Sequence, residues 1–296
     1  MTDAIALEGL TKRFGETAGV FGLDLHVAPG QIFGFLGPNG AGKTTTIRLL
    51  LSYLRPDAGS ARVFGLDSRR DAVALRRRIG YLPAEFNLYE HMTGSDLLAY
   101  LSRYRPPGSL ERARALAGRL GIKLDGRIRH YSKGMKQKVA LIQAMMHDPD
   151  LLILDEPSDG FDPLIQQEFH HLLGEARERG KTVLLSSHIL SEVEQLCDRV
   201  AIIRGGKLLA VEGVADLQAR KVRLLNLTFD APLDAREVGL PNATFRSQQG
   251  RHASFAYAGE ARELLVALAA LPVADFTLEP ARLEEVFLGY YENPRP

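Results

Sequence analysis

A glycine-rich segment of eight residues has the residue types that bind a chain of phosphates. It fits the pattern G-x-x-x-x-G-K-[ST], follows an apolar run ending at Leu36 and precedes an expected helix beginning near Thr45. Glycines allow the backbone to wrap closely around phosphates, and a helix N-terminus adds partial positive charge. We predict that Lys43 contacts the β- and γ-phosphates and that the Thr44 hydroxyl ligates Mg²⁺. The segment reads Gly37-Pro38-Asn39-Gly40-Ala41-Gly42-Lys43-Thr44, and Thr45 follows it.

Two carboxylates and a histidine end two other apolar runs. Asp155 and Glu156 follow residues 151–154, and His188 follows residues 182–187. Ligands bind beyond the carboxyl ends of parallel strands, so these side chains should meet the phosphates. We expect Asp155 to hold Mg²⁺, Glu156 to orient or deprotonate the attacking water, and His188 to contact the γ-phosphate.

A second candidate anion site lies at the start of the helix expected over residues 136–146. Ser132 is a good N-cap, and basic residues from Lys133 to Lys138 crowd the first turn, where they oppose the helix dipole. A bound anion would explain this arrangement. A capped helix with solvated lysines is an equally good interpretation of the segment by itself.

The elements around these residues alternate between strand and helix patterns, which predicts an α/β fold with a mostly parallel sheet. We expect one domain over 1–216, with a helical subdomain over about 85–150, and a small α+β domain over 217–296. The strands of the first domain are expected at 31–36, 151–154, 182–185 and 200–203, and its helices at 45–54, 136–146, 166–178 and 191–196. In the second domain, strands are expected at 222–229, 243–247, 253–257 and 273–278, and helices at 261–271 and 283–290.

Composition excludes several classes of protein. The 296 residues carry a net charge of +1 and are 45% hydrophobic, which is typical of a globular chain and not of a nucleic-acid-binding one. The longest apolar run, 264–271, is too short to span a membrane, and the first residues do not resemble an export signal. The single cysteine, Cys197, suits a reducing compartment and is expected to pack in a helix.

Taken together, these motifs resemble the ATP-binding subunit of an ABC transporter over about residues 5–216. Residues 37–44 are similar to the Walker A loop of that family, and 151–156 to its Walker B strand. Residues 131–137 resemble its signature, 158–162 its D-loop, and His188 its switch histidine. Phe14 stands at the position of the aromatic residue that stacks on adenine.

The resemblance implies a P-loop NTPase core, ATP and Mg²⁺ as ligands, and a head-to-tail dimer of two such subunits, either identical or merely similar. Each ATP would lie between the P-loop of one subunit and the signature helix of the other, through Ser132 and Gly134. The sequence departs from the family pattern in two places. In the signature, Lys133 and Met135 replace a Gly and the Gln of the usual sequence. Ala84 stands where many members carry a Gln, and the neighbouring Glu85 is the candidate substitute.

Residues 79–98 and 283–288 are similar to subunits of drug, antibiotic and polysaccharide exporters. This similarity implies a separate integral-membrane permease that contacts the chain near residues 86–100, and a cytoplasmic protein bound peripherally to the inner face of the membrane. Nucleic acid is not an expected partner.

Two other functions are consistent with parts of this pattern. A soluble ABC-type ATPase of translation or chromosome maintenance would usually have two cassettes or long coiled coils, but only 110 residues separate Thr44 from Asp155. A GTPase would carry an Asn-Lys-x-Asp tetrad, which the sequence lacks. The order of preference is therefore transporter ATPase, soluble ABC-type ATPase and GTPase.

Overall fold

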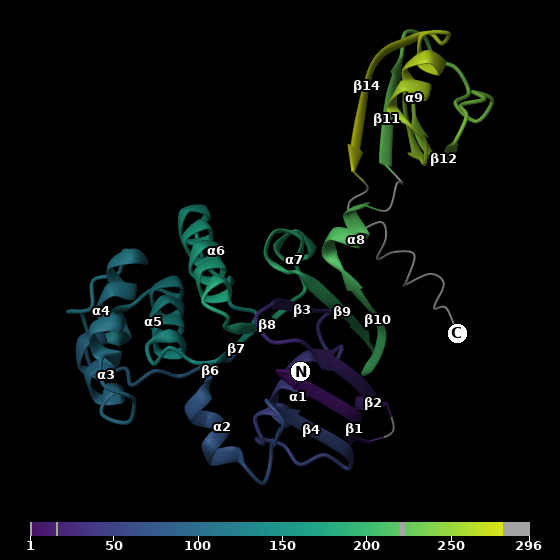
Figure 1. Cartoon of the computed structure of the whole chain (residues 1–296). Helices are drawn as coiled ribbons and strands as arrows, with labels where there is room; N and C mark the ends of the chain where they lie inside the picture. The colour runs from purple at the N-terminus through teal and green to yellow at the C-terminus, as the bar shows by residue number, and fades with distance from the viewer. Residues whose placement is uncertain (1, 16, 220–222, 281–296) are drawn as a thin grey trace. The chain divides into compact units, whose positions relative to one another are not determined.

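The computed structural model describes residues 2–15, 17–219 and 223–280 (Figure 1). Its contacts divide the chain into two compact units, residues 1–212 and 213–296. Among the described residues, no helix combines the length and the apolar character that crossing a membrane requires. The helix expected over 283–290 lies outside the described residues.

A six-stranded sheet forms the centre of the first unit, with the strand order β10-β9-β3-β8-β7-β6. The pairs β9/β3, β3/β8, β8/β7 and β7/β6 are parallel, so the carboxyl ends of these strands share one edge. Strands β3, β7 and β8 are buried along their whole length, as uninterrupted apolar runs predict. The bounds are β3 Ile32–Leu36, β6 Ile79–Leu82, β7 Leu151–Asp155, β8 Thr182–Ser187, β9 Arg199–Arg204 and β10 Lys207–Gly213.

A second, antiparallel sheet has the order β2-β1-β4-β5 and was not predicted. Helix α1 contacts strands of both sheets, and one hydrophobic core joins side chains from the two sheets and this helix. The helix that follows the glycine-rich segment is thereby fixed from both sides. The bounds are β1 Ile5–Phe14, β2 Ala18–Val27, α1 Lys43–Leu50, β4 Ala58–Val63 and β5 Leu66–Asp67.

Helices α6 and α7 lie on the side of the central sheet away from α1 (Figure 1). The packing of α7 on β3 is close, because a Cβ atom at Gly34 would lie 3.0 Å from Cys197 Sγ. Cys197 is buried there, as expected, and burial raises the pKa of its thiol. The bounds are α6 Pro163–Glu178 and α7 Leu190–Leu196.

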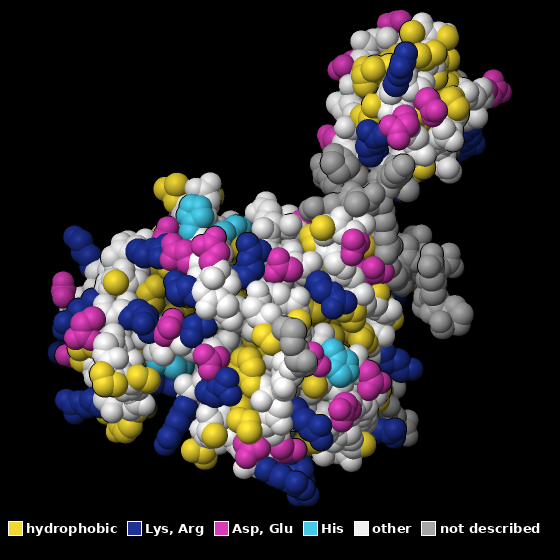
Figure 2. Space-filling view, in the orientation of Figure 1, with side chains coloured by type: hydrophobic (Ala, Val, Ile, Leu, Met, Phe, Trp, Pro, Cys, Tyr) yellow, Lys and Arg dark blue, Asp and Glu magenta, His cyan; other side chains and the backbone are white. Residues whose placement is uncertain are grey.

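Between β6 and β7 the chain forms a group of helices in which α4 packs against α3 and α5. A short helix, α2, precedes β6. Its last turn carries the basic run Arg76-Arg77-Arg78, of which Arg78 pairs with Asp150 at 2.8 Å. On the face shown in Figure 2, basic and acidic side chains are interspersed. The bounds are α2 Ala72–Arg78, α3 Gly94–Ser102, α4 Ser109–Arg119, η1 Ile128–His130 and α5 Lys133–Met145.

The second unit contains a four-stranded antiparallel sheet with the order β12-β13-β11-β14. It has its own core, which includes Leu225, Phe255 and Leu264. Four strands and one helix lie close to the predicted ranges. The bounds are α8 Val214–Ala219, β11 Arg223–Phe229, β12 Ala243–Gln249, β13 His252–Tyr257, α9 Ala261–Leu268 and β14 Val273–Pro280.

Candidate active site

The glycine-rich segment forms a tight loop between β3 and α1. Gly40 and Gly42 have φ angles of 79° and 110°, a region that favours glycine, and Gly42 is the N-cap of α1. Lys43 is only 5% exposed, and its ammonium group donates to the carbonyl oxygen of Gly37 at 2.6 Å. The lysine is thus folded back over the loop, in which the Ala41 amide donates to the Pro38 carbonyl oxygen at 3.1 Å. Amide groups in such a glycine-rich loop can bind an anion.

A cavity of about 320 Å³ opens in front of this loop. Phe14 stands at its edge with 48% of its surface exposed, as a residue that stacks on a base would. Ala84 also lines the cavity, whereas its neighbour Glu85 does not. The lining residues are Phe14, Ala18, Gly19, Pro38, Asn39, Gly40, Ala41, Gly42, Lys43, Thr44, Thr45, Ala84 and Glu156.

Thr44 and Asp155 meet at one end of the loop. The Thr44 hydroxyl donates to Asp155 Oδ2 at 2.8 Å, and the hydroxyl of Ser186 donates to the other carboxylate oxygen. Asp155 is fully buried, so both of its oxygens need such partners. In the part of the chain that the structure describes, no group of three or more His, Cys, Asp or Glu side chains could hold a metal ion. A hydroxyl and one carboxylate fit Mg²⁺, which takes few protein ligands and completes its shell with water and phosphate oxygens.

Glu156 lies between Lys43 and His188. Its Oε1 is 3.2 Å from the Lys43 ammonium, and its Oε2 is 2.7 Å from His188 Nδ1. Its φ of +50° is unusual for a residue other than glycine and turns the chain out of β7 toward the cavity. The Lys43 contact does not meet hydrogen-bond geometry, and Oε1 is buried without a hydrogen-bond partner among the described residues. The ion pair with Lys43 is therefore the one contact that holds Oε1 among the described residues.

The second candidate anion site is a well-formed helix start. Ser132 caps α5 by accepting a hydrogen bond from the Met135 amide at 3.2 Å. Lys133 and Lys136 each pair with a carboxylate of the same chain, Asp159 and Glu90, at 2.6 Å. These ion pairs offset part of the positive charge that the sequence places there. Ser132 and Gly134 do not line the cavity of the glycine-rich loop.

Sequence reasoning missed several residues that hold these groups. Ser186 binds Asp155, and Gln137 donates to the carbonyl oxygen of Pro157 at 2.9 Å. Glu192 accepts a hydrogen bond from Ser187 at 2.7 Å. The two serines at the end of a buried strand were a usable signal, since polar residues at that edge face the site. The partners of Gln137 and Glu192 had no local signal.

Comparisons with known families and relatives agree with the nucleotide site described above. Residues 20–159 match the ABC transporter family, and residues 126–194 match a family described as "AAA domain, putative AbiEii toxin, Type IV TA system". Nod factor export ATP-binding protein I of Paraburkholderia xenovorans is 36% identical over 293 residues, which are 96% of each chain. This chain belongs to the ATP-binding subunits of ABC transporters. Daunorubicin/doxorubicin resistance ATP-binding protein DrrA of Streptomyces peucetius is 34% identical over 99% of this chain and 94% of that protein.

Solved structures agree. A structure described as the ATP-binding subunit of an ABC transporter has a TM-score of 0.68 and 28% identity, over 73% of this chain and 92% of that one. CbiO1 of Clostridium perfringens has a TM-score of 0.61 and 25% identity, over 75% and 92% of the two chains. The chain is therefore a P-loop ABC ATPase that binds ATP and powers transport, and its curated relatives are exporter subunits. The soluble translation or chromosome ATPase is not favoured.

Proposed function

We propose that this subunit powers an exporter as one half of an ATP-dependent dimer bound to a membrane permease on the cytoplasmic face. The observation that carries the proposal is the contact of Glu156 with both Lys43 and His188, at the edge where Thr44 meets Asp155. This arrangement joins phosphate binding to water activation in one place. Export as the direction of transport is supported by the names of the relatives, a Nod factor export protein and a daunorubicin/doxorubicin resistance protein.

Each residue of the cluster has a distinct role in this proposal. The loop amides and Lys43 bind the β- and γ-phosphates, so Lys43 exchanges its contact with Glu156 for phosphate oxygens. Glu156 then orients the attacking water and accepts its proton, and His188 contacts the γ-phosphate while holding the Glu156 carboxylate. Thr44 and Asp155 would hold Mg²⁺, which supplies neutralisation of the phosphate charge when bound.

The second half of the site would come from another copy of the chain or from a similar ATPase. Helix α5 has 13 residues, and its N-terminus carries partial positive charge. Ser132 and Lys133 are exposed, and a side chain at position 134 would lie 2.7 Å from the Gly160 carbonyl oxygen. Gly134 therefore leaves room for close approach of the loop over 158–162. We assign Ser132 and Gly134 to the γ-phosphate of an ATP held by the partner's loop.

A groove in the first unit suits the proposed permease. Its volume is about 550 Å³, and Phe86, Tyr53 and Tyr81 give it an aromatic lining. Arg48, Arg76 and Arg105 also line the groove, and the described lining residues include no carboxylate. Burial lowers the pKa of Arg105, as expected for a cation removed from water. An apolar permease segment with acidic side chains would complement this surface.

The proposed chemistry is tested by the substitution Glu156→Gln. Removing the base should lower the ATPase kcat by roughly 100- to 10,000-fold, while ATP binding persists because the phosphate contacts remain. Glu178→Gln, at an exposed site on α6, is the matched control and should keep wild-type turnover. Wild-type kcat in Glu156→Gln would remove Glu156 from the mechanism.

A further inference from the structure

Glu192 is a buried acidic side chain whose role the nucleotide contacts leave open. It lies in the first turn of α7 and is 7% exposed, in a helix where Ser191 and Gln195 are exposed and Glu194 is partly buried. Burial raises the pKa of its carboxyl, and hydrogen bonding from the Ser187 hydroxyl opposes that rise. A carboxyl so far from water needs a reason to be retained.

One side of Glu192 fixes the strand end that carries His188. Its Oε2 accepts a hydrogen bond from the Ser187 hydroxyl at 2.7 Å, and the same hydroxyl oxygen accepts one from the Ile189 amide at 2.9 Å. The Ser187 hydroxyl therefore links the residue before His188 to the residue after it, Ile189. Of the two acceptors within reach of that hydroxyl, Glu192 Oε2 is the nearer, at 2.7 Å against 3.3 Å for the Ile189 carbonyl oxygen.

The other side of Glu192 faces the loop that follows Glu156. Ser158, two residues after Glu156, is buried, and its hydroxyl influences the pKa of the same carboxyl. Glu192 Oε1 has no hydrogen-bond partner among the described residues. Glu192 Oε1 is thus a buried acceptor beside the loop over 158–162. Asp159 of this loop pairs with Lys133.

We propose that Glu192 is a positioning residue for ATP hydrolysis, which holds the His188 strand end through Ser187. The inference rests on the proposed roles of Glu156 and His188. Glu192 touches neither nucleotide nor the reacting atoms in this proposal. It acts by keeping His188 Nδ1 within 2.7 Å of the Glu156 carboxylate.

The test is a steady-state ATPase series on the full chain with ATP and Mg²⁺. Glu192→Met keeps the length and burial of the side chain but removes both acceptor oxygens, and it should lower kcat by about tenfold or more because the reacting groups lose alignment. The KM for ATP should stay within about twofold, since the phosphate contacts are intact. Glu192→Gln retains one acceptor oxygen and should restore most of the turnover. Gln195→Ala, on the exposed face of the same helix, should have no effect.

Coupling to His188 separates positioning from general stability. In a His188→Ala background, Glu192→Met should lower kcat no further, because the group that it positions is gone. Ser187→Ala provides a second route and should show the same dependence on His188.

Wild-type kcat in both Glu192→Met and Ser187→Ala would overturn the proposal, as would an equal loss in the presence and absence of His188. If Glu156→Gln and His188→Ala lower kcat but Glu192→Met does not, only this inference fails. If His188→Ala keeps wild-type turnover, the proposed role of His188 fails, and this inference fails with it.

Discussion

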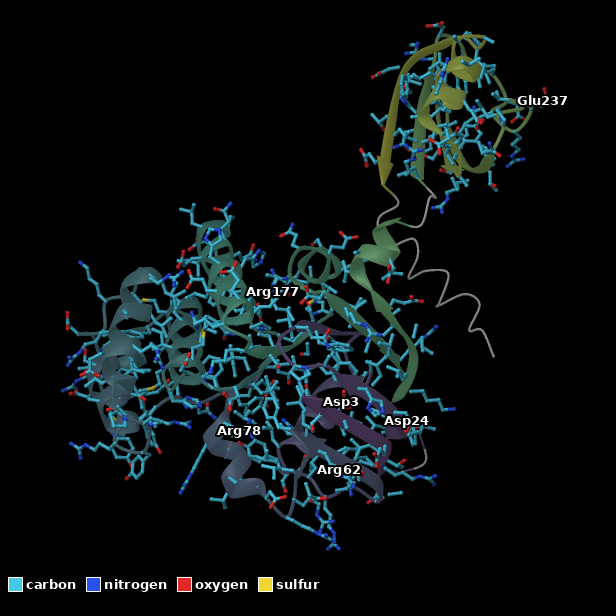
Figure 3. All side chains as sticks on the ribbon, viewed as in Figure 1. Asp3, Asp24, Arg62, Arg78, Arg177 and Glu237 are labelled. Carbon is cyan, nitrogen blue, oxygen red and sulfur yellow. The ribbon has the colours of Figure 1, made fainter. Side chains whose placement is uncertain are left out.

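The two ends of the central parallel sheet both carry carboxylates, but their surroundings differ. At the amino ends, Asp150 pairs with Arg78 at 2.8 Å and with Lys181 at 3.3 Å, and Asp198 pairs with Arg177 at 2.9 Å. Figure 3 labels Arg78 and Arg177 on separate helices that bring these cations to the sheet. Each acid at this end has a cation of its own chain.

At the carboxyl ends, acceptor oxygens are left over. Glu156 and Glu192 each keep one buried carboxylate oxygen without a hydrogen-bond partner among the described residues, whereas the unpaired buried atoms near the amino ends are nitrogens, Gln31 Nε2 and His147 Nδ1. Buried acceptors are usually satisfied, so these two oxygens mark a place where a ligand can supply the missing hydrogen bond. The amino ends thus serve stability, and the carboxyl ends serve chemistry.

The largest difference between the two ends should appear in nucleotide affinity. Lys43→Ala removes a charged donor to the phosphates and should weaken ATP binding by about 10- to 100-fold, as measured by titration calorimetry. Asp150→Asn, at the other end of the sheet, is the control, and it should lower only the melting temperature. An unchanged ATP affinity in Lys43→Ala would contradict the role given to this lysine.

A smaller effect should appear at the amino ends as a dependence of stability on pH. Burial, helped by nearby Arg105, lowers the pKa of His147 from 6.5 to about 4, and its Nε2 lies 3.1 Å from the Ile79 carbonyl oxygen at the start of β6. Below about pH 6.5, His147 therefore binds a proton in the unfolded chain but stays neutral in the folded chain. The free energy of unfolding falls as the pH drops through this range.

Between pH 7 and pH 5, the wild type should lose about 2 kcal/mol more free energy of unfolding than His147→Gln. Denaturant unfolding at the two pH values measures this difference. His171→Gln, at an exposed site on α6, should keep the wild-type dependence. Equal pH dependence in the wild type and His147→Gln would show that His147 titrates normally.

The sequence predicted those features of the sheet ends that are encoded by neighbouring residues. The loop over 37–44 and the strands over 151–154 and 182–185 are local patterns, and the structure has a tight loop and two buried strands there. Asp155, Glu156 and His188 follow from their positions at strand ends. Their contacts with one another and with Lys43 join residues more than 30 positions apart, which spacing alone cannot specify.

The antiparallel sheet was missed for a different reason. Strand β1 shifts register against β2 between Leu7 and Leu10, so the alternation of buried and exposed residues breaks in mid-strand. Gly9 and Gly22, with φ angles of 55° and 60°, mark the irregular positions. Glu192 was missed because it lies beside Ser191 in a polar segment that is typical of a solvated helix.

The central claim, that ATP is held between two copies, is tested most directly by the mass of Glu156→Gln in solution. With ATP and Mg²⁺, light scattering should give twice the chain mass of 32.6 kDa, and with ADP it should give one chain mass. Adding Ser132→Arg, which would place a bulky side chain at the proposed trans contact, should return the ATP-bound protein to a single chain. A single chain mass for Glu156→Gln with ATP, at concentrations that saturate binding, would contradict the account.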